Sequence, residues 1–377
     1  MDSQERNALH SALEPVAASA GVSNKLLSSV TADLQLDETV LKLADSQPEH
    51  LYTVGQYIER LVTDERIATA KAMWNMHRGT LDRITDAYGV PPQVLLAIWG
   101  IESNFGTRMG KFSLLRSLAT LIAKGGRRQS FWCEQFIAAI ELGELQNIPV
   151  RTLTGSWAGA IGHMQFIPTT YRDFAIDFDN DGRADIVSSI SDAFASAANY
   201  LAKSGWQHQR LCSFEIVLPY DFDFNNFADG KQRPFHVWQG LNMTPIESHL
   251  PTCGNETLYR LLLPAGAAGP AFLVTKNFDA LLTYNAAVPY ALAVTHLADR
   301  VSGKNSISAL WPRDLPLNLE ERRSLQQSLV GLGYTTGGVD GILGRASRSA
   351  IRQYQVANGL VADGYPARVL LEHLQQK

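Results

Sequence analysis

Apolar residues recur at helical spacing through most of the first 145 residues, and this periodicity constrains the fold more than any other feature. It predicts helices over Val30–Leu43, Val54–Arg78, Thr80–Tyr88, Val94–Asn104, Leu114–Leu121 and Phe131–Leu142. Two later helices are predicted over Asp192–Ser204, which ends at Gly205, and over Ala291–Val301. The sequence therefore predicts a mainly α fold.

The pattern changes between Trp206 and Phe278, where the apolar segments become short. Phe214–Leu218 and Ala271–Val274 are separated by proline, glycine and asparagine, which predicts strands joined by loops. We interpret this region as a small β insertion in a helical domain, which makes the fold class mainly α with an α+β character. Glycine and proline in residues 302–317 predict a linker, followed by a second, smaller domain over residues 318–377.

Composition narrows the class of protein. With 377 residues, 45% of them hydrophobic and 19% charged, the chain is an ordinary globular protein with room for more than one domain. A formal net charge of −4 without a basic run gives no reason to expect nucleic acid as a partner. The most apolar stretch, Leu261–Val274, is interrupted by Pro264 and Gly266, so no membrane span is predicted.

The N-terminal residues 1–6 lack the basic and apolar regions of a signal peptide. We therefore expect either a cytosolic protein or one whose leader is already removed. The three cysteines, Cys133, Cys212 and Cys253, lack the spacing of metal ligands. An exported protein could pair Cys212 with Cys253, and the alternative interpretation is buried free thiols.

Glu102 is a lone carboxylate near the end of an apolar helix that begins at Pro91-Pro92. Gly106, after Phe105, is a suitable terminator of that helix. An apolar setting disfavours the ionised carboxylate and raises its pKa, which makes such a glutamate a general acid near neutral pH. The alternative interpretation is a solvated glutamate at a helix end.

The segment Asp177-Phe178-Asp179-Asn180-Asp181-Gly182-Arg183-Ala184-Asp185 has alternating carboxylates with glycine in sixth place, like the start of an EF-hand loop. It predicts a structural Ca²⁺ site within residues 177–192. Its ligands would be side chains of Asp177, Asp179 and Asp181, the backbone carbonyl of Arg183, and Asp185 directly or through water. Ser188 stands where a regular loop has glutamate, and Asp192 could supply the missing carboxylate. The alternative is a solvated acidic turn; no organic cofactor is indicated.

Two other segments carry isolated polar groups among small or aromatic residues. In residues 155–168, closely spaced glycine and alanine let the backbone approach a ligand, while Ser156 and Gln165 offer directed hydrogen bonds. Tyr284-Asn285 and Tyr290 place an amide between two rings, which suits the apolar faces and hydroxyl groups of sugars. The alternatives are tight helix packing for the first segment and a turn with core tyrosines for the second.

Taken together, these residues resemble the catalytic domain of the B-type lytic murein transglycosylases, glycoside hydrolase family 103. The resemblance covers residues 1 to about 301 and rests, in family order, on Trp99–Gly106, Gly155–Ala160, Gln165-Phe166, the Asp177 loop, Ala198–Leu201, Tyr284-Asn285 and Tyr290–Val294. It implies a lysozyme-like helical catalytic core over residues 1–301 and a Ca²⁺ site in the acidic loop. It further implies a single catalytic acid, Glu102, in a cleft lined by Ser156, Gln165, Tyr200, Tyr284, Asn285 and Tyr290.

This chain departs from the family pattern at two positions. His163 stands where the family commonly has glutamine, so one amide contact with substrate is expected to be replaced by an imidazole. Ala287 stands where a serine is frequent, which removes a hydrogen bond near the aminosugar. We interpret both as tuning of substrate binding.

The C-terminal segment resembles the three-helix peptidoglycan-binding domain of type 1, on the motifs Leu325–Tyr334, Gly338–Gly344, Ala350–Gln355 and Asn358–Leu360. A tethered wall-binding module raises the effective concentration of a catalytic cleft along an insoluble polymer. It indicates the same substrate independently of the catalytic motifs.

The resemblance implies cleavage of the β-1,4 bond between N-acetylmuramic acid and N-acetylglucosamine, with Glu102 acting as acid and then as base. Closure of a 1,6-anhydro ring on the muramoyl product would replace hydrolysis. Two alternatives stay open: a hydrolytic muramidase that uses Glu102 with Asp173 or Asp177, and a non-catalytic peptidoglycan-binding protein.

The expected partners are peptidoglycan glycan strands and their stem peptides, with proteins of cell-wall synthesis or division as further candidates. Because this substrate lies outside the cytoplasm, we expect a soluble, monomeric periplasmic protein whose signal peptide is absent from the sequence.

Overall fold

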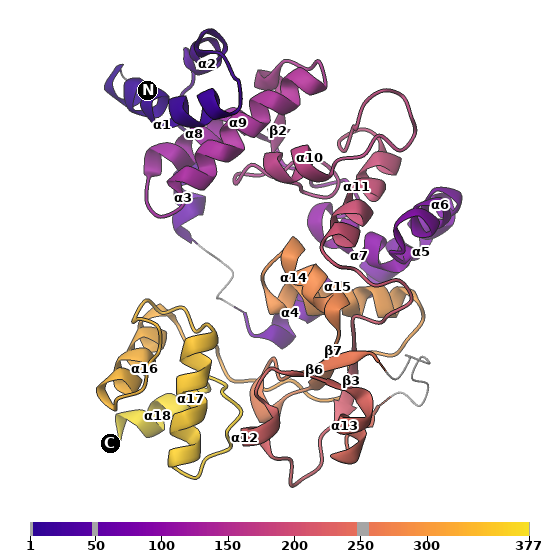
Figure 1. Ribbon diagram of the computed structural model, residues 1–377, viewed down its shortest axis with the longest axis vertical. Coiled ribbons are helices and arrows are strands. Elements are labelled where there is room, and N and C mark those ends of the chain that lie inside the picture. Colours follow the sequence, from indigo (N-terminus) through magenta and orange to yellow (C-terminus); the bar gives the residue numbers. More distant parts are fainter. Residues whose placement is uncertain (1–2, 47–51, 247–255, 377) are drawn as a thin grey trace. The chain divides into compact units, whose positions relative to one another are not determined.

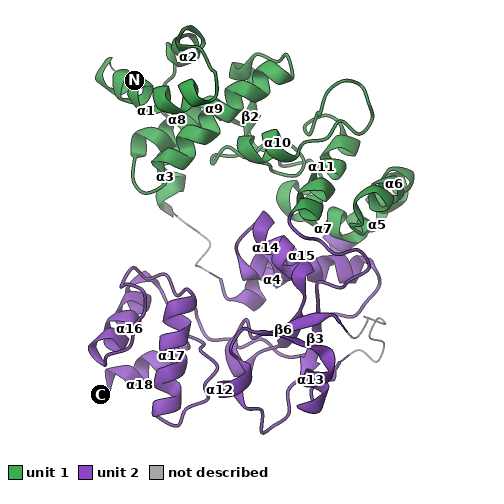
Figure 2. Cartoon of the chain, in the orientation of Figure 1, with its two compact units in different colours: residues 1–47, 68–203 green, residues 48–67, 204–377 purple. Residues whose placement is uncertain are grey.

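The computed structural model describes residues 3–46, 52–246 and 256–376. These form two compact units, residues 1–47 with 68–203 and residues 48–67 with 204–377 (Figure 2). Both are rich in helices, and the strands are few and short (Figure 1). The predicted fold class, mainly helical with a small β region, is confirmed.

The first unit consists of helices and a two-stranded sheet. Its helices are α1 (Ser3–Ser19), α2 (Asn24–Thr31), α3 (Glu38–Ser46), α6 (Arg78–Tyr88), α7 (Pro92–Ser103), α8 (Leu114–Lys124), α9 (Gln129–Leu145), α10 (Pro168–Phe174) and α11 (Ile190–Lys203). Strands β1 (Phe112–Ser113) and β2 (Thr154–Gly155) pair in antiparallel register. Helix α9 packs against α1, α8 and α10, whereas α11 packs against α6 and α7.

Two predicted helices are each interrupted in the structure. Residues Val30–Leu43 divide between α2 and α3, because the Asp37 carboxylate accepts the backbone N–H groups of Thr39 and Val40 and starts a new helix. Residues Val54–Arg78 divide into α4 (Val54–Leu61), α5 (Asp64–Met76) and the start of α6, and the Thr63 hydroxyl accepts the N–H of Arg66. The apolar periodicity does not reveal such a break, because the helices on either side of it each bury an apolar face.

The second unit is built on a five-stranded antiparallel sheet. Its order is β4 (Gln232–Pro234), β6 (Leu258–Leu262), β7 (Ala271–Val274), β3 (Ser213–Val217) and β5 (Thr244–Pro245). Strand β7 has the bounds predicted from the sequence. The helices of this part are α4, α12 (Phe224–Phe227), α13 (Phe235–Gly240), α14 (Lys276–Tyr284) and α15 (Val288–Val301), and α15 packs against α4 and α14.

The two faces of this sheet are different. On one face, Ile216, Leu261 and Leu273 pack with the fully buried Trp238 of α13. The alternate residues of β3 and β7 point to the other face, where Glu215 and Phe272 are paired across the strands. Leu292 and Thr295 of α15 face this second side across a cavity.

Helices α16 (Leu319–Gly331), α17 (Arg345–Ala357) and α18 (Arg368–Gln375) enclose a small core of their own. Asn318 and Glu321 form a capping box at the start of α16. The Gln326 side-chain oxygen accepts the N–H of Gly341 at 2.7 Å and fixes the turn between α16 and α17. This is the three-helix arrangement predicted for the C-terminal segment.

The predicted linker, residues 302–317, contains neither helix nor strand. It is nevertheless attached to the second unit by side-chain contacts. The Glu215 carboxylate accepts the N–H groups of Ser308 and Ala309, each at 2.8 Å. The Trp311 ring lies so close to Gly55 that a Cβ atom there would be 2.5 Å from Trp311 Cγ. Further along, the Asp363 carboxylate accepts the N–H of Ala267 at 2.8 Å.

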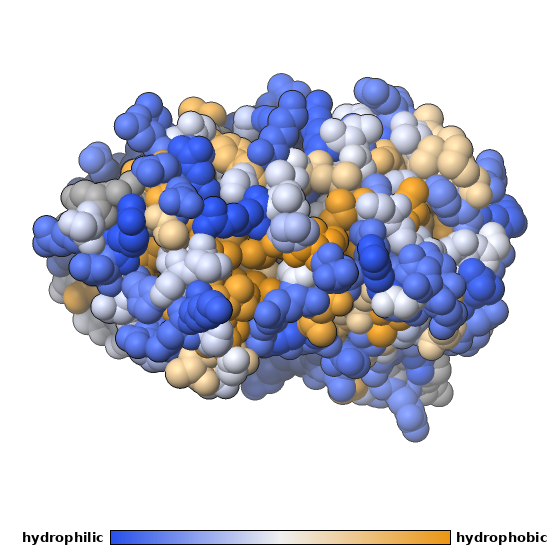
Figure 3. All heavy atoms as spheres, turned by 90° about the horizontal axis from the view of Figure 1, so that it is seen from above, coloured by the Kyte–Doolittle hydropathy of each residue, from blue (hydrophilic) through white to orange (hydrophobic). Residues whose placement is uncertain are grey.

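On the face drawn in Figure 3, hydrophilic residues predominate at the outer surface and hydrophobic residues show between them. Across the described part of the chain, no helix combines the length and apolarity that a membrane span requires. Cys133 and Cys212 are buried, and Cys253, the partner considered for Cys212, lies outside the described residues.

Candidate active site

Glu102 lies in the last turn of α7, as predicted, and its side chain is half-buried. The helix starts at Pro92, whose fixed φ suits the first turn, and nearly every residue from Val94 to Gly100 is in the core. A helix buried over this length cannot shift without losing packing. Glu102 is therefore carried by a rigid element.

The backbone directly after Glu102 turns through three consecutive left-handed residues. Asn104, Phe105 and Gly106 have φ values of 48°, 56° and 82°. Such angles are unfavourable for a bulky residue like Phe105 and persist only where the surroundings hold them. Ser103 supplies part of that support, since its hydroxyl accepts the N–H of Gly106 at 3.0 Å.

A second loop, residues 155–166, lies against this turn. The Ser103 hydroxyl donates to the His163 carbonyl at 2.7 Å, and the Trp99 indole N–H donates to His163 Nδ1 at 3.0 Å. Burial lowers the pKa of His163 below its ordinary value. The residue is 9% exposed, and its ring lies against Trp99 and Gly106, so the imidazole that was expected to contact substrate lies in the interior.

Ser156 and Gln165 lie in the same loop, and both are already engaged with backbone. The Ser156 hydroxyl accepts the N–H of Ala160 at 3.0 Å, which leaves its hydrogen as a donor. The Gln165 amide nitrogen donates to the carbonyls of Gly162 and Met109, at 2.8 and 3.2 Å. The oxygen of that amide is therefore oriented, and Gln165 itself has a positive φ of 50°.

Tyr200 of α11 lies in the same unit, with its ring packed on Phe174 at 4.4 Å and edge-on to Phe166 at 5.9 Å between centroids. Burial raises the pKa of its hydroxyl. Phe166 neighbours Gln165 in the chain. The structure thus brings Glu102, Ser156, Gln165 and Tyr200 onto connected elements of the first unit.

Tyr284, Asn285 and Tyr290 belong to the second unit, at the junction of α14 and α15. The two tyrosine rings are parallel, with centroids 6.4 Å apart and planes inclined by 8°. Tyr290 is 2% exposed, whereas Asn285 is exposed and its side-chain oxygen accepts the N–H of Ala287 at 3.2 Å. Of the three, Asn285 and the half-buried Tyr284 have surface available to a ligand.

Three of the predicted metal ligands converge. Oxygen atoms of Asp177, Asp179 and Asp192 lie within 4.8 Å of one another. Asp192, at 0% exposure, accepts the N–H groups of Phe178 and Asp185, both at 2.9 Å, and so ties the loop to the start of α11. Burial raises the pKa of the Asp192 carboxyl, and the nearby Asp179 charge is a smaller cause in the same direction.

The carboxylates of two other predicted ligands, Asp181 and Asp185, accept hydrogen bonds from the backbone of the loop. The carboxylate of Asp181 accepts the N–H of Arg183 at 2.9 Å, and that of Asp185 accepts the N–H groups of Val187 and Ser188. Neither belongs to the converging group. Hard oxygen donors around one point are the ligand set that Ca²⁺ prefers, so the three converging carboxylates fit that ion.

The acids considered for a hydrolytic mechanism have other contacts. Asp173 accepts the Arg172 guanidinium at 2.8 Å on the surface. Asp177 accepts the N–H groups of Asp181 and Gly182 at 3.2 and 2.9 Å within the acidic loop.

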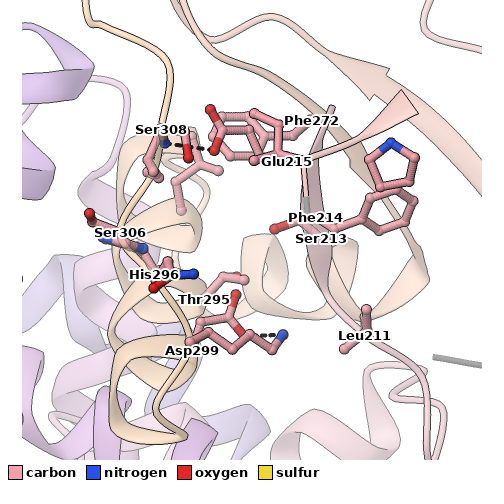
Figure 4. A pocket seen from close by; sticks show the side chains of 16 residues that line it. Leu211, Ser213, Phe214, Glu215, Phe272, Thr295, His296, Asp299, Ser306 and Ser308 are labelled. Carbon is pink, nitrogen blue, oxygen red and sulfur yellow. Dashed lines mark hydrogen bonds and ion pairs between the residues drawn. The ribbon is translucent and has the colours of Figure 1, made fainter. Parts of the chain in front are cut away.

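A cavity of about 420 Å³ in the second unit is separate from all of these residues (Figure 4). Strands β3 and β7, helix α15 and residues 304–308 line it. Burial lowers the pKa of His296, one of its walls, to about 4, with the Arg300 charge as a smaller cause. No predicted catalytic, cleft or metal residue contributes to this cavity.

Trp99 and Ser103 support the turn after Glu102, a role that the sequence did not indicate. The pattern that could have indicated Ser103 is a hydroxyl residue three positions before a glycine at the end of an apolar helix. The pairing of Trp99 with His163 joins positions 64 residues apart, so no local pattern could have indicated it.

Comparison with known proteins gives two family matches. The model of the transglycosylase SLT domain matches residues 4–299, and that of a peptidoglycan binding domain matches residues 318–374. Membrane-bound lytic murein transglycosylase B of Escherichia coli (strain K12) is 25% identical over an alignment of 295 residues, which covers 75% of this chain and 79% of the relative.

Among solved structures, SltB3 of Pseudomonas aeruginosa is 40% identical, with a TM-score of 0.91 over 98% of this chain and 99% of its own. It was solved in complex with NAG-anhNAM-pentapeptide and with NAG-NAM-pentapeptide. The lytic transglycosylase Slt35 of Escherichia coli, solved in complex with calcium, shares the fold at 24% identity, with a TM-score of 0.67 over 78% of this chain and 92% of its own.

These relatives are lytic transglycosylases, and neither the hydrolytic nor the non-catalytic alternative is favoured by them. The chain therefore belongs to the transglycosylase SLT family and is a lytic murein transglycosylase, an enzyme that cleaves peptidoglycan without hydrolysis.

Proposed function

We propose that Glu102 is the single acid and base of this lytic transglycosylase. The observation that carries the proposal is the half-buried Glu102 carboxylate at the end of a buried helix, followed by a strained turn that fixes its direction. The acids that a second catalytic role would need, Asp173 and Asp177, are bound to Arg172 and to loop backbone.

In the first step, the protonated Glu102 carboxyl gives its proton to the glycosidic oxygen between N-acetylmuramic acid and N-acetylglucosamine, and the C1–O bond breaks. In the second step, the Glu102 carboxylate takes the proton of the muramoyl C6 hydroxyl, whose oxygen attacks C1. A 1,6-anhydro ring closes, Glu102 is protonated again, and no water is consumed.

The cleft that holds the glycan would use the oriented polar groups beside Glu102. The Ser156 hydroxyl hydrogen and the Gln165 side-chain oxygen are the groups that the loop backbone leaves for substrate. Tyr200 would present a ring to a sugar face, and Tyr284, Asn285 and Tyr290 would be the sugar-binding residues of the second unit.

Ca²⁺ would bind between Asp177, Asp179 and Asp192, with Asp181, Asp185 and the Arg183 carbonyl reached by adjustment of the loop or through water. The ion would neutralise three crowded carboxylates, one of them fully buried, and would hold the loop on α11. Its role would be structural.

The natural substrate would be peptidoglycan glycan strands with stem peptides, bound by the C-terminal helices as well as by the cleft. Because this polymer lies outside the cytoplasm, the enzyme would be a soluble, monomeric protein of the periplasm. Domain limits at residues 1–301, 302–317 and 318–377 remain our prediction.

The test is digestion of purified sacculi by wild type and by Glu102→Gln, with the released muropeptides identified by mass spectrometry. Wild type should release 1,6-anhydromuramoyl products, and Glu102→Gln should release roughly 1,000-fold less, because an amide can neither give nor take the proton. Binding of the variant to sacculi should be unchanged.

The matched control is Glu14→Gln, which changes an exposed carboxylate of α1 in the same unit. Products with reducing ends would indicate hydrolysis instead. Full activity of Glu102→Gln would refute the assignment of the catalytic residue.

A further inference from the structure

His163 contacts the interior side of the catalytic helix and not the solvent side. Its ring is T-shaped to that of Trp99, with centroids 5.5 Å apart, and its Nδ1 accepts the Trp99 indole N–H at 3.0 Å. An indole nitrogen can only donate, so Nδ1 carries a lone pair and the ring is the neutral tautomer with hydrogen on Nε2. Trp99 is 2% exposed and lies three residues before Glu102.

His163 also supports the strained turn that follows Glu102. Its carbonyl accepts the Ser103 hydroxyl at 2.7 Å, and the same hydroxyl accepts the N–H of Gly106 at 3.0 Å. Its ring fills the space beneath Gly106, since a Cβ atom at that glycine would be 2.5 Å from His163 Cε1. His163 therefore contacts the catalytic helix before Glu102 and the turn after it.

Glu102 lies between these two points of support. Of the three left-handed residues, Asn104 and Phe105 are not glycine, so each costs roughly 1–3 kcal/mol and stays in place only where neighbours overdetermine it. The contacts from His163, together with the Phe105 ring at 5.4 Å from Trp99, provide that constraint.

We propose that His163 is a positioning residue, which sets the direction of the Glu102 carboxylate through Trp99 and through the Ser103–Gly106 turn. The inference rests on the proposed role of Glu102. It differs from the expectation that the imidazole replaces an amide contact with substrate, because the ring is buried against the helix. A positioning residue acts on turnover, whereas a substrate contact acts on affinity.

The test compares His163→Leu with His163→Asn on a soluble glycan of defined length. Leucine keeps an apolar body but removes the acceptor; asparagine places its oxygen near the position of Nδ1. We expect His163→Leu to lower kcat roughly 10- to 100-fold with KM within about twofold of wild type, and His163→Asn to recover most of kcat. A rise in KM at unchanged kcat would overturn the proposal in favour of a substrate contact.

Folding is followed separately by thermal melting and by the NMR signal of the Trp99 indole N–H. In wild type, this proton should be shifted downfield and slow to exchange, as a buried hydrogen-bonded donor; in His163→Leu it should move upfield. If Tm falls while kcat of the folded fraction stays at the wild-type value, His163 is merely structural and the proposal is wrong.

Trp99→Phe, which removes the donor, is then combined with His163→Leu. Because both changes break one contact, the double variant should lose no more kcat than the worse single variant. Independent, multiplying losses would show that the two residues do not act through a shared hydrogen bond, which contradicts the proposal.

Glu102→Gln separates this proposal from the one on which it rests. If Glu102→Gln keeps activity, the catalytic assignment fails whatever His163 does. If Glu102→Gln is inactive while His163→Leu turns over at the wild-type rate, only the positioning role fails.

Discussion

At the scale of single residues, the site depends on positions where no other side chain fits. Gly106 has a φ of 82° and no room for a Cβ atom beside His163. Gly21 has a similar φ of 76° but nothing within 4 Å of the place where a Cβ would be. A comparison of alanine substitutions at these two glycines therefore separates the cost of backbone strain from the cost of steric contact.

Gly106→Ala should lower both stability and activity. The left-handed conformation alone costs about 1 kcal/mol for alanine, and the contact with the His163 ring adds roughly 1–3 kcal/mol or displaces the turn. We expect kcat to fall by roughly 10-fold or more and the melting temperature of the first unit to fall by several degrees, measured by calorimetry and by release of soluble muropeptides.

Gly21→Ala is the control. It should lose only the roughly 1 kcal/mol of the left-handed conformation, because nothing lies within 4 Å of its new Cβ atom, and it should leave kcat unchanged. Equal losses in the two variants would mean that strain, and not contact with His163, explains the result.

His296 gives the second unit a pH dependence of stability. Burial lowers its pKa in the folded protein to about 4, against about 6.5 when unfolded, so the unfolded chain takes up a proton first as pH falls. The stability that the neutral ring contributes is complete above about pH 6.5 and is lost between about pH 6.5 and about 4. The loss is at most about 3 kcal/mol, and less because the ring borders a cavity.

Urea unfolding of the second unit at about pH 7 and about pH 4.5 measures this loss, and His296→Gln should reduce it. His208→Gln, at an exposed histidine, should leave it unchanged. His77 and His163, whose pKa values burial also lowers, lie in the first unit, so an effect confined to that unit would contradict the assignment to His296.

At the scale of elements, the acidic loop links the proposed metal site to the catalytic turn. Asp192 ties the loop to α11, and the carbonyl of Ile186, inside the loop, accepts the N–H of His163 at 3.1 Å. Gly162 also fits against this carbonyl, because a Cβ there would be 2.4 Å from it. The loop therefore contacts the backbone of His163, the residue that accepts the Trp99 indole N–H.

Removal of Ca²⁺ should destabilise the first unit and also lower kcat. Three carboxylates without a cation repel one another, so chelator should lower the melting temperature by several degrees and added Ca²⁺ should restore it. Asp179→Asn should abolish the Ca²⁺-dependent rise, because it removes one of the three converging carboxylates.

Asp86→Asn, at an exposed carboxylate of α6 in the same unit and outside the acidic loop, is the matched control and should keep the full response. A melting temperature that neither chelator nor Ca²⁺ changes would refute the metal site.

At the scale of the whole molecule, the sheet, residues 302–317 and the C-terminal helices belong to one compact unit. Glu215, Trp311 and Asp363 attach successive parts of the C-terminal half to that unit. We therefore expect the C-terminal helices to unfold together with the sheet, although they have a core of their own and match a family model of their own.

Gly55→Ala tests this coupling. Alanine normally stabilises a helix by about 1 kcal/mol over glycine, but a Cβ here would collide with the Trp311 ring. We expect a net loss of roughly 1–3 kcal/mol, seen in calorimetry as a lower melting temperature of the second unit with the first unit unchanged.

Gly79→Ala is the control, since Gly79 is also the second residue of a helix and has nothing within 4 Å of the position that an alanine methyl group would take. It should stabilise its own unit slightly. If Gly55→Ala stabilises the second unit in the same way, Trp311 does not hold residues 302–317 in place.

The sequence by itself determined the fold class, strand β7, the helix that carries Glu102, the acidic loop and both family resemblances. The elements depend on periodicity and capping residues, which are readable within a few turns of chain, and the resemblances depend on short motifs and on their order along the sequence. It did not find the breaks after Thr31 and Leu61, because apolar spacing continues across a capped junction.

Only the tertiary structure decided what His163 contacts. In the sequence, the position of His163 in a motif of the family's cleft indicated a contact with sugar. In the fold, its ring faces Trp99 and its carbonyl accepts the Ser103 hydroxyl. The same holds for the acidic loop, where the pattern offers five aspartates as ligands and the structure brings the carboxylates of three of them together. The direction of a side chain depends on contacts between segments distant in the chain, and local pattern carries no information about them.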